Sequence, residues 1–174
     1  MPPHLLLPVL ISLAGVVVVA FQQLRVRDKR DRVQTSRFAK AFFGISVVAV
    51  LAVTLLDGAT PATAEWRSVN LVPGETIAGQ WHNLSRSTGL LNIAGNVVLF
   101  SPVAYFLRLG WRCNSLIVMA LCAGMSLAIE LVQYQTGRSA DIDDLILNTV
   151  GALLGLLAAL CVEHWSSRRV RTPS

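Results

Sequence analysis

Apolar residues in this chain are gathered into long blocks, whereas a soluble domain of similar length would scatter them periodically among polar positions. Each block approaches the roughly 20 residues that cross about 30 Å of hydrocarbon as a helix, and the blocks carry almost no internal charge. The pattern predicts an all-α membrane protein with five transmembrane helices. The predicted spans are residues 5–21, 38–56, 91–107, 115–134 and 145–162.

Basic residues lie mainly in alternate loops between these blocks. Twelve of the fifteen Lys and Arg residues fall between the first block and the start of the second, between the third and fourth, or after the fifth. The positive-inside bias then places the N-terminus outside and the C-terminus in the cytoplasm. The basic residues behind the net charge of +5 are therefore expected to set the orientation in the membrane and to attract anionic lipids at the cytoplasmic face. They predict no nucleic-acid partner.

The chain shows no internal repeat and no low-complexity linker, so we expect a single polytopic membrane domain over residues 1–174. The first block has its basic residues after the apolar stretch, which favours an uncleaved span over a signal peptide. The basic segment 22–37 is predicted to be a solvated connector that is partly helical. The loop 57–89 carries Trp66 and Trp81 and is predicted to lie on the outer membrane surface.

The stretch D-I-D-D-L-I-L-N-T-V-G-A-L-L-G, residues 141–155, combines acids, an amide and glycines with an apolar span. Asp141, Asp144, Asn148, Gly151 and Gly155 recur at steps of three and four, so on a helix they share one face. Gly137 suits the end of the preceding helix, and Ser139 or Asp141 suits the N-cap of this one. The two glycines predict the close approach of another helix. Polar groups on such a face require a partner, a wet cavity or a function.

Polar residues recur at the outer ends of the two preceding spans. Asn92 and Asn96 lie four residues apart on the third span, and Glu130 and Gln133 share a face of the fourth. Under the predicted topology these groups lie at similar depth, and Arg138 sits in the turn above them. We therefore predict a polar site that opens outward among spans three to five.

Several chemistries fit this site. Glu130 or Asp144 could act as a general base while Arg138 binds a phosphate or carboxylate. The acids Glu130, Asp141, Asp143 and Asp144 could instead hold a divalent cation, but no metal-ligand spacing is diagnostic, so we predict no metal site and leave the cofactor open. The group could also serve a small proton-coupled carrier. The structural alternative is a clamp between Arg138 and a carboxylate, with the amides as hydrogen-bonding contacts between helices.

Four segments in order resemble the VanZ-like family of bacterial membrane proteins over about residues 70–155. They are N-L-V-P (70–73), N-I-A-G-N-V-V-L-F-S-P (92–102), S-L-A-I-E-L-V-Q (126–133) and G-R-S-A-D-I-D-D-L-I-L-N-T-V-G-A-L-L-G (137–155). The founding member of that family is associated with low-level resistance to the glycopeptide antibiotic teicoplanin. One departure is Gly74, where the resemblance implies an aromatic residue. The family pattern, carried over to this sequence, marks Asn92, Asn96, Phe100, Pro102, Glu130, Gln133, Arg138, Asp141, Asp144, Asn148 and Gly151.

The resemblance and the polar site together predict a protein of the bacterial plasma membrane that acts at the cell envelope on or with a lipid-like, cell-wall or glycopeptide ligand, with teicoplanin resistance as the implied phenotype. Whether it is an enzyme stays open. The alternatives are a non-enzymatic scaffold or accessory subunit and a small proton-coupled transporter. The residues expected to carry catalysis are Glu130, Asp144 and Arg138, and those expected to bind the ligand are Asn92, Asn96, Gln133, Asp141 and Asn148.

Overall fold

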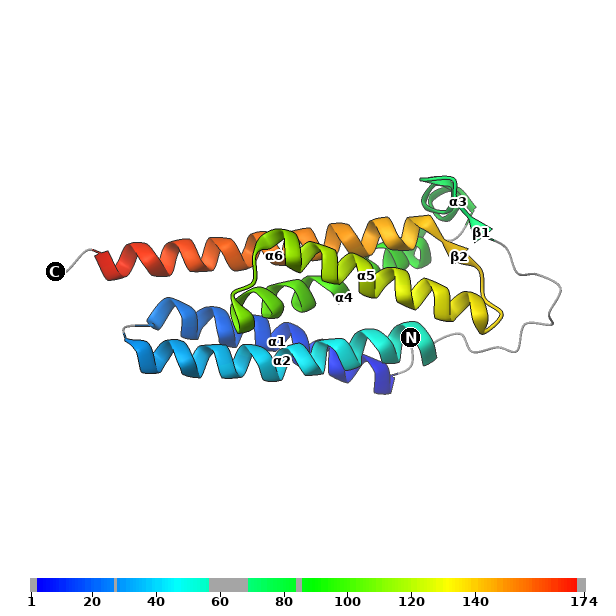
Figure 1. Ribbon diagram of the computed structural model, residues 1–174. Helices are drawn as coiled ribbons and strands as arrows, with labels where there is room; N and C mark the ends of the chain where they lie inside the picture. Colours follow the sequence, from blue (N-terminus) through cyan, green and yellow to red (C-terminus); the bar gives the residue numbers. More distant parts are fainter. Residues whose placement is uncertain (1–2, 27, 57–68, 84–85, 172–174) are drawn as a thin grey trace.

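The computed structural model describes residues 3–26, 28–56, 69–83 and 86–171, with backbone alone at 3–5, 80–83, 86–92 and 169–171. The described part of the chain is almost entirely helical, and five of its helices are long and apolar enough to cross a membrane: α1, α2, α4, α5 and α6. This confirms the predicted all-α, five-span membrane protein. The elements are α1 (Pro3–Arg25), α2 (Lys29–Leu56), β1 (Val69–Asn70), α3 (Glu75–Asn83), α4 (Arg86–Trp111), α5 (Ser115–Gln135), β2 (Ala140–Asp141) and α6 (Ile142–Arg171) (Figure 1).

Helix α4 is the centre of the bundle and packs against all four other long helices, most extensively against α6. The α4–α6 contact is backbone to backbone. A Cβ atom added to Gly151 would collide with the carbonyl oxygen of Val97, and one added to Gly155 would collide with that of Ser101. The Ser101 hydroxyl also donates to the Gly151 carbonyl at 2.9 Å. The prediction that these two glycines admit a neighbouring helix is confirmed.

The protein core surrounds α4, because its apolar side chains face other helices on several sides. Phe100, Tyr105 and Phe106 are fully buried, and the ring of Phe106 stacks on Phe42 of α2 with centroids 5.6 Å apart. By contrast, α1 and α5 expose many large apolar side chains. In a membrane protein these exposed side chains are the surface available to lipid.

At one end of the bundle, α1 meets α2 and α6 runs on to Arg171; we call this the basic end (Figure 1). Helix α2 begins at Lys29, well before the predicted span, because Asp28 accepts the Asp31 N–H at 2.8 Å and so caps the helix. The helical character predicted for part of this connector is confirmed, and the cations of α2 from Lys29 onward lie on the helix.

At the opposite end, β1 and α3 form a small structure over the bundle that we call the roof (residues 69–83). Strand β1 pairs in parallel with β2, with Val69 opposite Ala140 and Asn70 opposite Asp141. The outer-surface position predicted for loop 57–89 rested on Trp66 and on the Trp81 side chain, which lie outside the described part of the chain.

The turn between α5 and α6 has the glycine cap expected from the sequence. Helix α5 ends at Gln135, and Gly137 follows with φ at 91°, a left-handed conformation that suits glycine. The N–H of Arg138 then donates back to the Gln133 carbonyl at 3.0 Å. This tight reversal sets the position from which the Arg138 side chain extends.

Candidate functional site

The first turn of α6 holds the roof in place through Asp143. This carboxylate is 1% exposed, and it accepts the N–H of Gly74 at 2.6 Å and that of Ile77 at 3.1 Å. Both N–H groups belong to the start of α3, where a helix leaves its N–H groups without intrahelical partners. Asp143 therefore caps α3 from another element. The sequence alone suggests only a metal-ligand role for Asp143, because a cap supplied by a distant segment leaves no local signal.

Asp141 does not share the helix face predicted for it. Helix α6 begins at Ile142, and Asp141 lies in the extended β2. Its carboxylate accepts the Asp143 N–H at 2.9 Å, which makes it the N-cap of α6. The predicted cap is thus confirmed and the predicted face is wrong for Asp141, because an N-cap residue has non-helical backbone angles. Its own N–H donates to Glu130 Oε2 at 2.9 Å.

Two side-chain pairs link α6 to its neighbours below this turn. Asn96 Nδ2 of α4 donates to Asp144 Oδ1 at 2.7 Å, and Asn148 Nδ2 donates to Ser126 Oγ of α5 at 2.9 Å. The Asn148–Ser126 pair is buried, and Asn148 Oδ1 has no hydrogen-bond partner among the described residues. Three helices thus bring polar groups together as expected. The side chain of Asn92 lies outside the described residues.

Gln133 and Arg138 meet at a single acceptor on α2, the backbone carbonyl of Thr54. Gln133 Nε2 and Arg138 Nη1 each donate to this oxygen at 2.8 Å. Thr54 lies in the last turn of α2, where carbonyls lack intrahelical partners and the helix dipole favours a cation. Arg138 also interacts electrostatically with Glu130 and Asp144. This role of α2 is not predicted by the sequence, since nothing local to Thr54 indicates it.

A pocket of about 360 Å³ lies between the roof, α5 and the start of α6. Its polar groups include Glu130, Asp141 and Asn70, and Glu130 is only 7% exposed. Its walls are otherwise mostly apolar, and Leu127 and Leu131 are half exposed on the flank of α5. The lining residues are Val69, Asn70, Leu71, Leu127, Glu130, Leu131, Tyr134, Ala140, Asp141, Ile142 and Leu145.

The predicted site residues fall into two groups, those that line the pocket and those that do not. Glu130 and Asp141 line it, whereas Asn96, Gln133, Arg138, Asp144 and Asn148 make contacts between helices beside it. In the described ranges no group of three or more His, Cys, Asp or Glu side chains is arranged to hold a metal ion. The divalent-cation alternative therefore gains no support from the arrangement of the acids.

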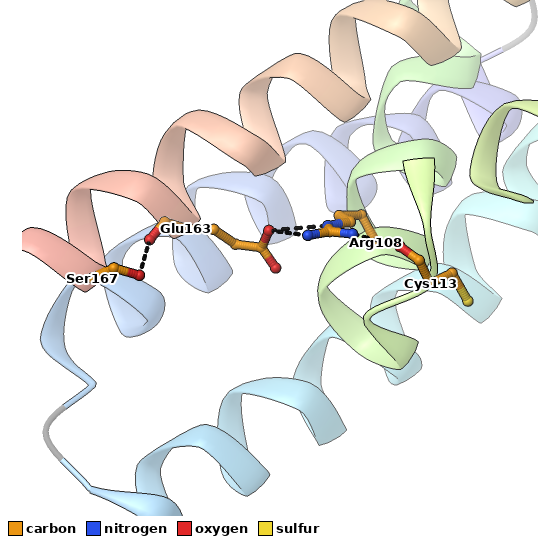
Figure 2. Close-up of polar contacts among 4 residues, drawn as sticks. All are labelled: Arg108, Cys113, Glu163 and Ser167. Atoms are coloured by element: carbon orange, nitrogen blue, oxygen red, sulfur yellow. Dashed lines mark hydrogen bonds and ion pairs between the residues drawn. The ribbon is translucent and has the colours of Figure 1, made fainter. Parts of the chain in front are cut away.

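Towards the basic end, Arg108 of α4 forms an ion pair with Glu163 of α6 that was not predicted from the sequence. Arg108 Nη2 lies 2.7 Å and Nε 3.0 Å from Glu163 Oε2, and Nη1 donates to the Cys113 carbonyl at 2.6 Å (Figure 2). The two side chains are 20% and 16% exposed. The feature of the sequence that could have indicated this ion pair is Glu163, an acid close to the basic C-terminal residues.

Replacing Arg108 by Gln is expected to lower the free energy of unfolding by about 1.5–3 kcal/mol, because it removes hydrogen bonds to a charged partner and to the turn. Arg112→Gln provides the control, since Arg112 is exposed in the same turn. Denaturant titration of the purified variants in detergent measures both changes. Equal stability of the two variants would contradict a structural role for the pair.

A family model, VanZ/LLP1, matches residues 42–163 of this chain. The match covers the roof, α4, α5 and α6 up to the basic end, together with the second half of α2. No curated protein and no solved structure gives a significant match to the sequence. The family match extends over well over half of the chain and includes every polar contact described above at the roof end of the bundle. This chain is a membrane protein of the VanZ/LLP1 family.

Proposed function

We propose that this protein binds an amphipathic, lipid-like envelope molecule in the pocket between the roof, α5 and α6. The observation that carries the proposal is a nearly buried carboxylate, Glu130, at the polar end of a largely apolar pocket on the flank of a membrane helix. Small-molecule sites in proteins commonly have this form, with apolar walls and a few polar groups that fix orientation. The protein would act in the bacterial plasma membrane.

The chemistry of the polar end selects the ligand. Glu130 and Asp141 are hydrogen-bond acceptors when ionised, so they favour a head group that presents hydroxyl, amide or ammonium donors. Leu127, Leu131 and Leu145 offer an apolar wall for a hydrocarbon portion. Sugar or peptide groups attached to a lipid combine both properties, as do the cell-wall and glycopeptide ligands implied by the family resemblance.

In this proposal the two groups of polar residues have different roles. Glu130 and Asp141 contact the ligand, and Glu130 is the candidate general base if a reaction follows binding. Asn96, Gln133, Arg138, Asp144 and Asn148 hold the helices in position around the pocket. This differs from the roles predicted from the sequence, where Arg138 bound an anion and Asp144 took part in catalysis.

A non-enzymatic scaffold is the second candidate. It is favoured by the observation that most of the predicted site residues already form hydrogen bonds between helices. Such contacts are worth about 0.6 kcal/mol on average in a membrane and explain polar residues without any ligand. Under this reading, Glu130 would only hold the start of α6 through the Asp141 N–H.

The test is the Glu130→Gln variant, compared with Asp144→Asn and with Glu75→Gln, which removes an exposed acid from the roof. Glutamine can still accept the Asp141 N–H, so Glu130→Gln is expected to change the stability by less than about 1 kcal/mol. We expect it to abolish protection of expressing cells against teicoplanin, after that protection has been established for the unaltered protein. Glu75→Gln should keep protection.

Thermal unfolding in detergent and teicoplanin susceptibility of the same variants separate the candidates. Protection lost by Glu130→Gln with stability kept supports the ligand pocket. Unchanged protection in Glu130→Gln, or protection lost only together with stability, supports the scaffold. A pH-dependent solute flux into liposomes that Glu130→Gln abolishes would indicate a transporter instead.

A further inference from the structure

A second hollow lies far from this pocket, between α1 and α2 at the basic end. It has a volume of about 580 Å³. From α1 it is lined by Val17, Val18, Phe21, Gln22 and Arg25, and from α2 by Asp31, Gln34 and Thr35. We call it the α1–α2 groove. One half of this groove is apolar and the other half is polar, so it has a defined direction along the helices.

The spacing along α1 matches the dimensions of an amphiphile. Val17, Phe21 and Arg25 follow at steps of four, so they share one face of the helix. At 1.5 Å per residue, Arg25 lies about 12 Å beyond Val17 along the axis. Val17 is 70% exposed and Phe21 is 53% exposed. The Arg25 guanidinium lies 3.9 Å from the centre of the Phe21 ring, which fixes the cation at the boundary between the two halves.

The surroundings of Arg25 favour an anion. A neighbouring hollow on α2 shares Gln34 with the groove and is lined by the cations Lys29, Arg30 and Arg37. These outweigh the one acid that lines the groove, Asp31. In addition, Gln22 Oε1 is buried and has no hydrogen-bond partner among the described residues, which leaves an acceptor for a donor group. Phosphate supplies the anion, and a hydroxyl in the head group supplies the donor.

We infer that the α1–α2 groove binds one anionic glycerophospholipid drawn from the bilayer. An acyl chain lies along Val17, Val18 and Phe21, and the phosphate meets Arg25. This site is independent of the proposed function, because it lies at the opposite end of the molecule. All of its lining residues named above also lie outside the family match, which begins at residue 42. The site would therefore be a property of this chain that the family match does not imply.

The experiment is native mass spectrometry of the full-length protein in detergent, titrated with phosphatidylglycerol or phosphatidylcholine. We expect one phosphatidylglycerol to be retained about fivefold more tightly than phosphatidylcholine. Arg25→Gln should reduce its affinity to that of phosphatidylcholine. Arg32→Gln is the matched control, because Arg32 is an exposed cation at the same end that lines neither hollow, and it should leave retention unchanged.

Three outcomes would overturn the inference. Equal retention of the two lipids by the unaltered protein would show only ordinary lipid contact. Equal losses in Arg25→Gln and Arg32→Gln would show a diffuse charge effect, and displacement of the lipid by soluble glycerol 3-phosphate would show a phosphate site that needs no chain. Thermal unfolding checks that each variant is folded, and the comparison of lipids on the unaltered protein decides the question if Arg25→Gln does not fold.

Discussion

Gly155→Ala is expected to destabilise the bundle by roughly 1–3 kcal/mol, although alanine is the better helix former. The added methyl group would meet the Ser101 carbonyl oxygen, which belongs to the backbone of α4 and cannot rotate away. Helices α4 and α6 would have to separate, and the Asn96–Asp144 contact between them would be strained. Gly155→Val should be worse, since a larger side chain forces a greater separation.

Gly124→Ala is the matched control for this experiment. Gly124 lies in α5, and a Cβ atom added there meets nothing within 4 Å. The same chemical change should therefore be neutral or stabilise the protein by up to about 1 kcal/mol, as expected for a glycine replaced inside a helix. Thermal or denaturant unfolding in detergent measures both variants. If both changes shift the melting temperature in the same direction, the inference that Gly155 is needed for the close packing of α4 against α6 is contradicted.

Asp143→Leu is expected to release the roof from the bundle while the transmembrane helices stay folded. The change removes the acceptor for two partly buried N–H groups at the start of α3, at a cost of up to about 1–3 kcal/mol for each group left unsatisfied. The described contacts that would still hold the roof are the two-residue pairing of β1 with β2 and the packing of α3 against α4. Hydrogen exchange of the amides of α3, measured by mass spectrometry, should become much faster.

Asp143→Asn is expected to have an intermediate effect on hydrogen exchange in α3. Asparagine keeps one acceptor oxygen and loses the other, so exchange in α3 should fall between that of the unaltered protein and that of Asp143→Leu. Because β1 forms one wall of the pocket, teicoplanin protection should fall in the same order if the proposed function holds. Unchanged exchange in both variants would mean that α3 is held by contacts other than Asp143.

The transmembrane architecture could be predicted because hydropathy acts over a whole span and needs no knowledge of partners. The same holds for the cap at Gly137 and the helix contact of Gly151 and Gly155, which depend on local backbone geometry and side-chain size. Asp141 shows the limit of a periodic pattern. A spacing of three or four residues places a group on a helix face only if the helix includes it, and here the helix begins one residue later.

The candidate site was less predictable because its contacts come from elements far apart in the sequence. Thr54 accepts from Gln133 and Arg138 across 79 and 84 residues, and Asp143 reaches Gly74 across 69 residues. The contributing atoms at Thr54, Gly74 and Ile77 are backbone groups, which every residue possesses. Residue identity therefore gave no indication of them, whereas the side-chain donors and acceptors on α4, α5 and α6 could be named in advance.

The contacts between α4 and α6 also decide which parts of this protein can move. The two helices are joined near one end by Arg108 and Glu163, near the other by Asn96 and Asp144, and between these by glycine contacts without intervening side chains. Sliding one helix along the other would break both polar pairs and drive side chains into the opposite backbone. We therefore expect α4 and α6 to move together as one frame, and any rearrangement that admits a large ligand at the pocket to involve its other walls, α5 and the roof.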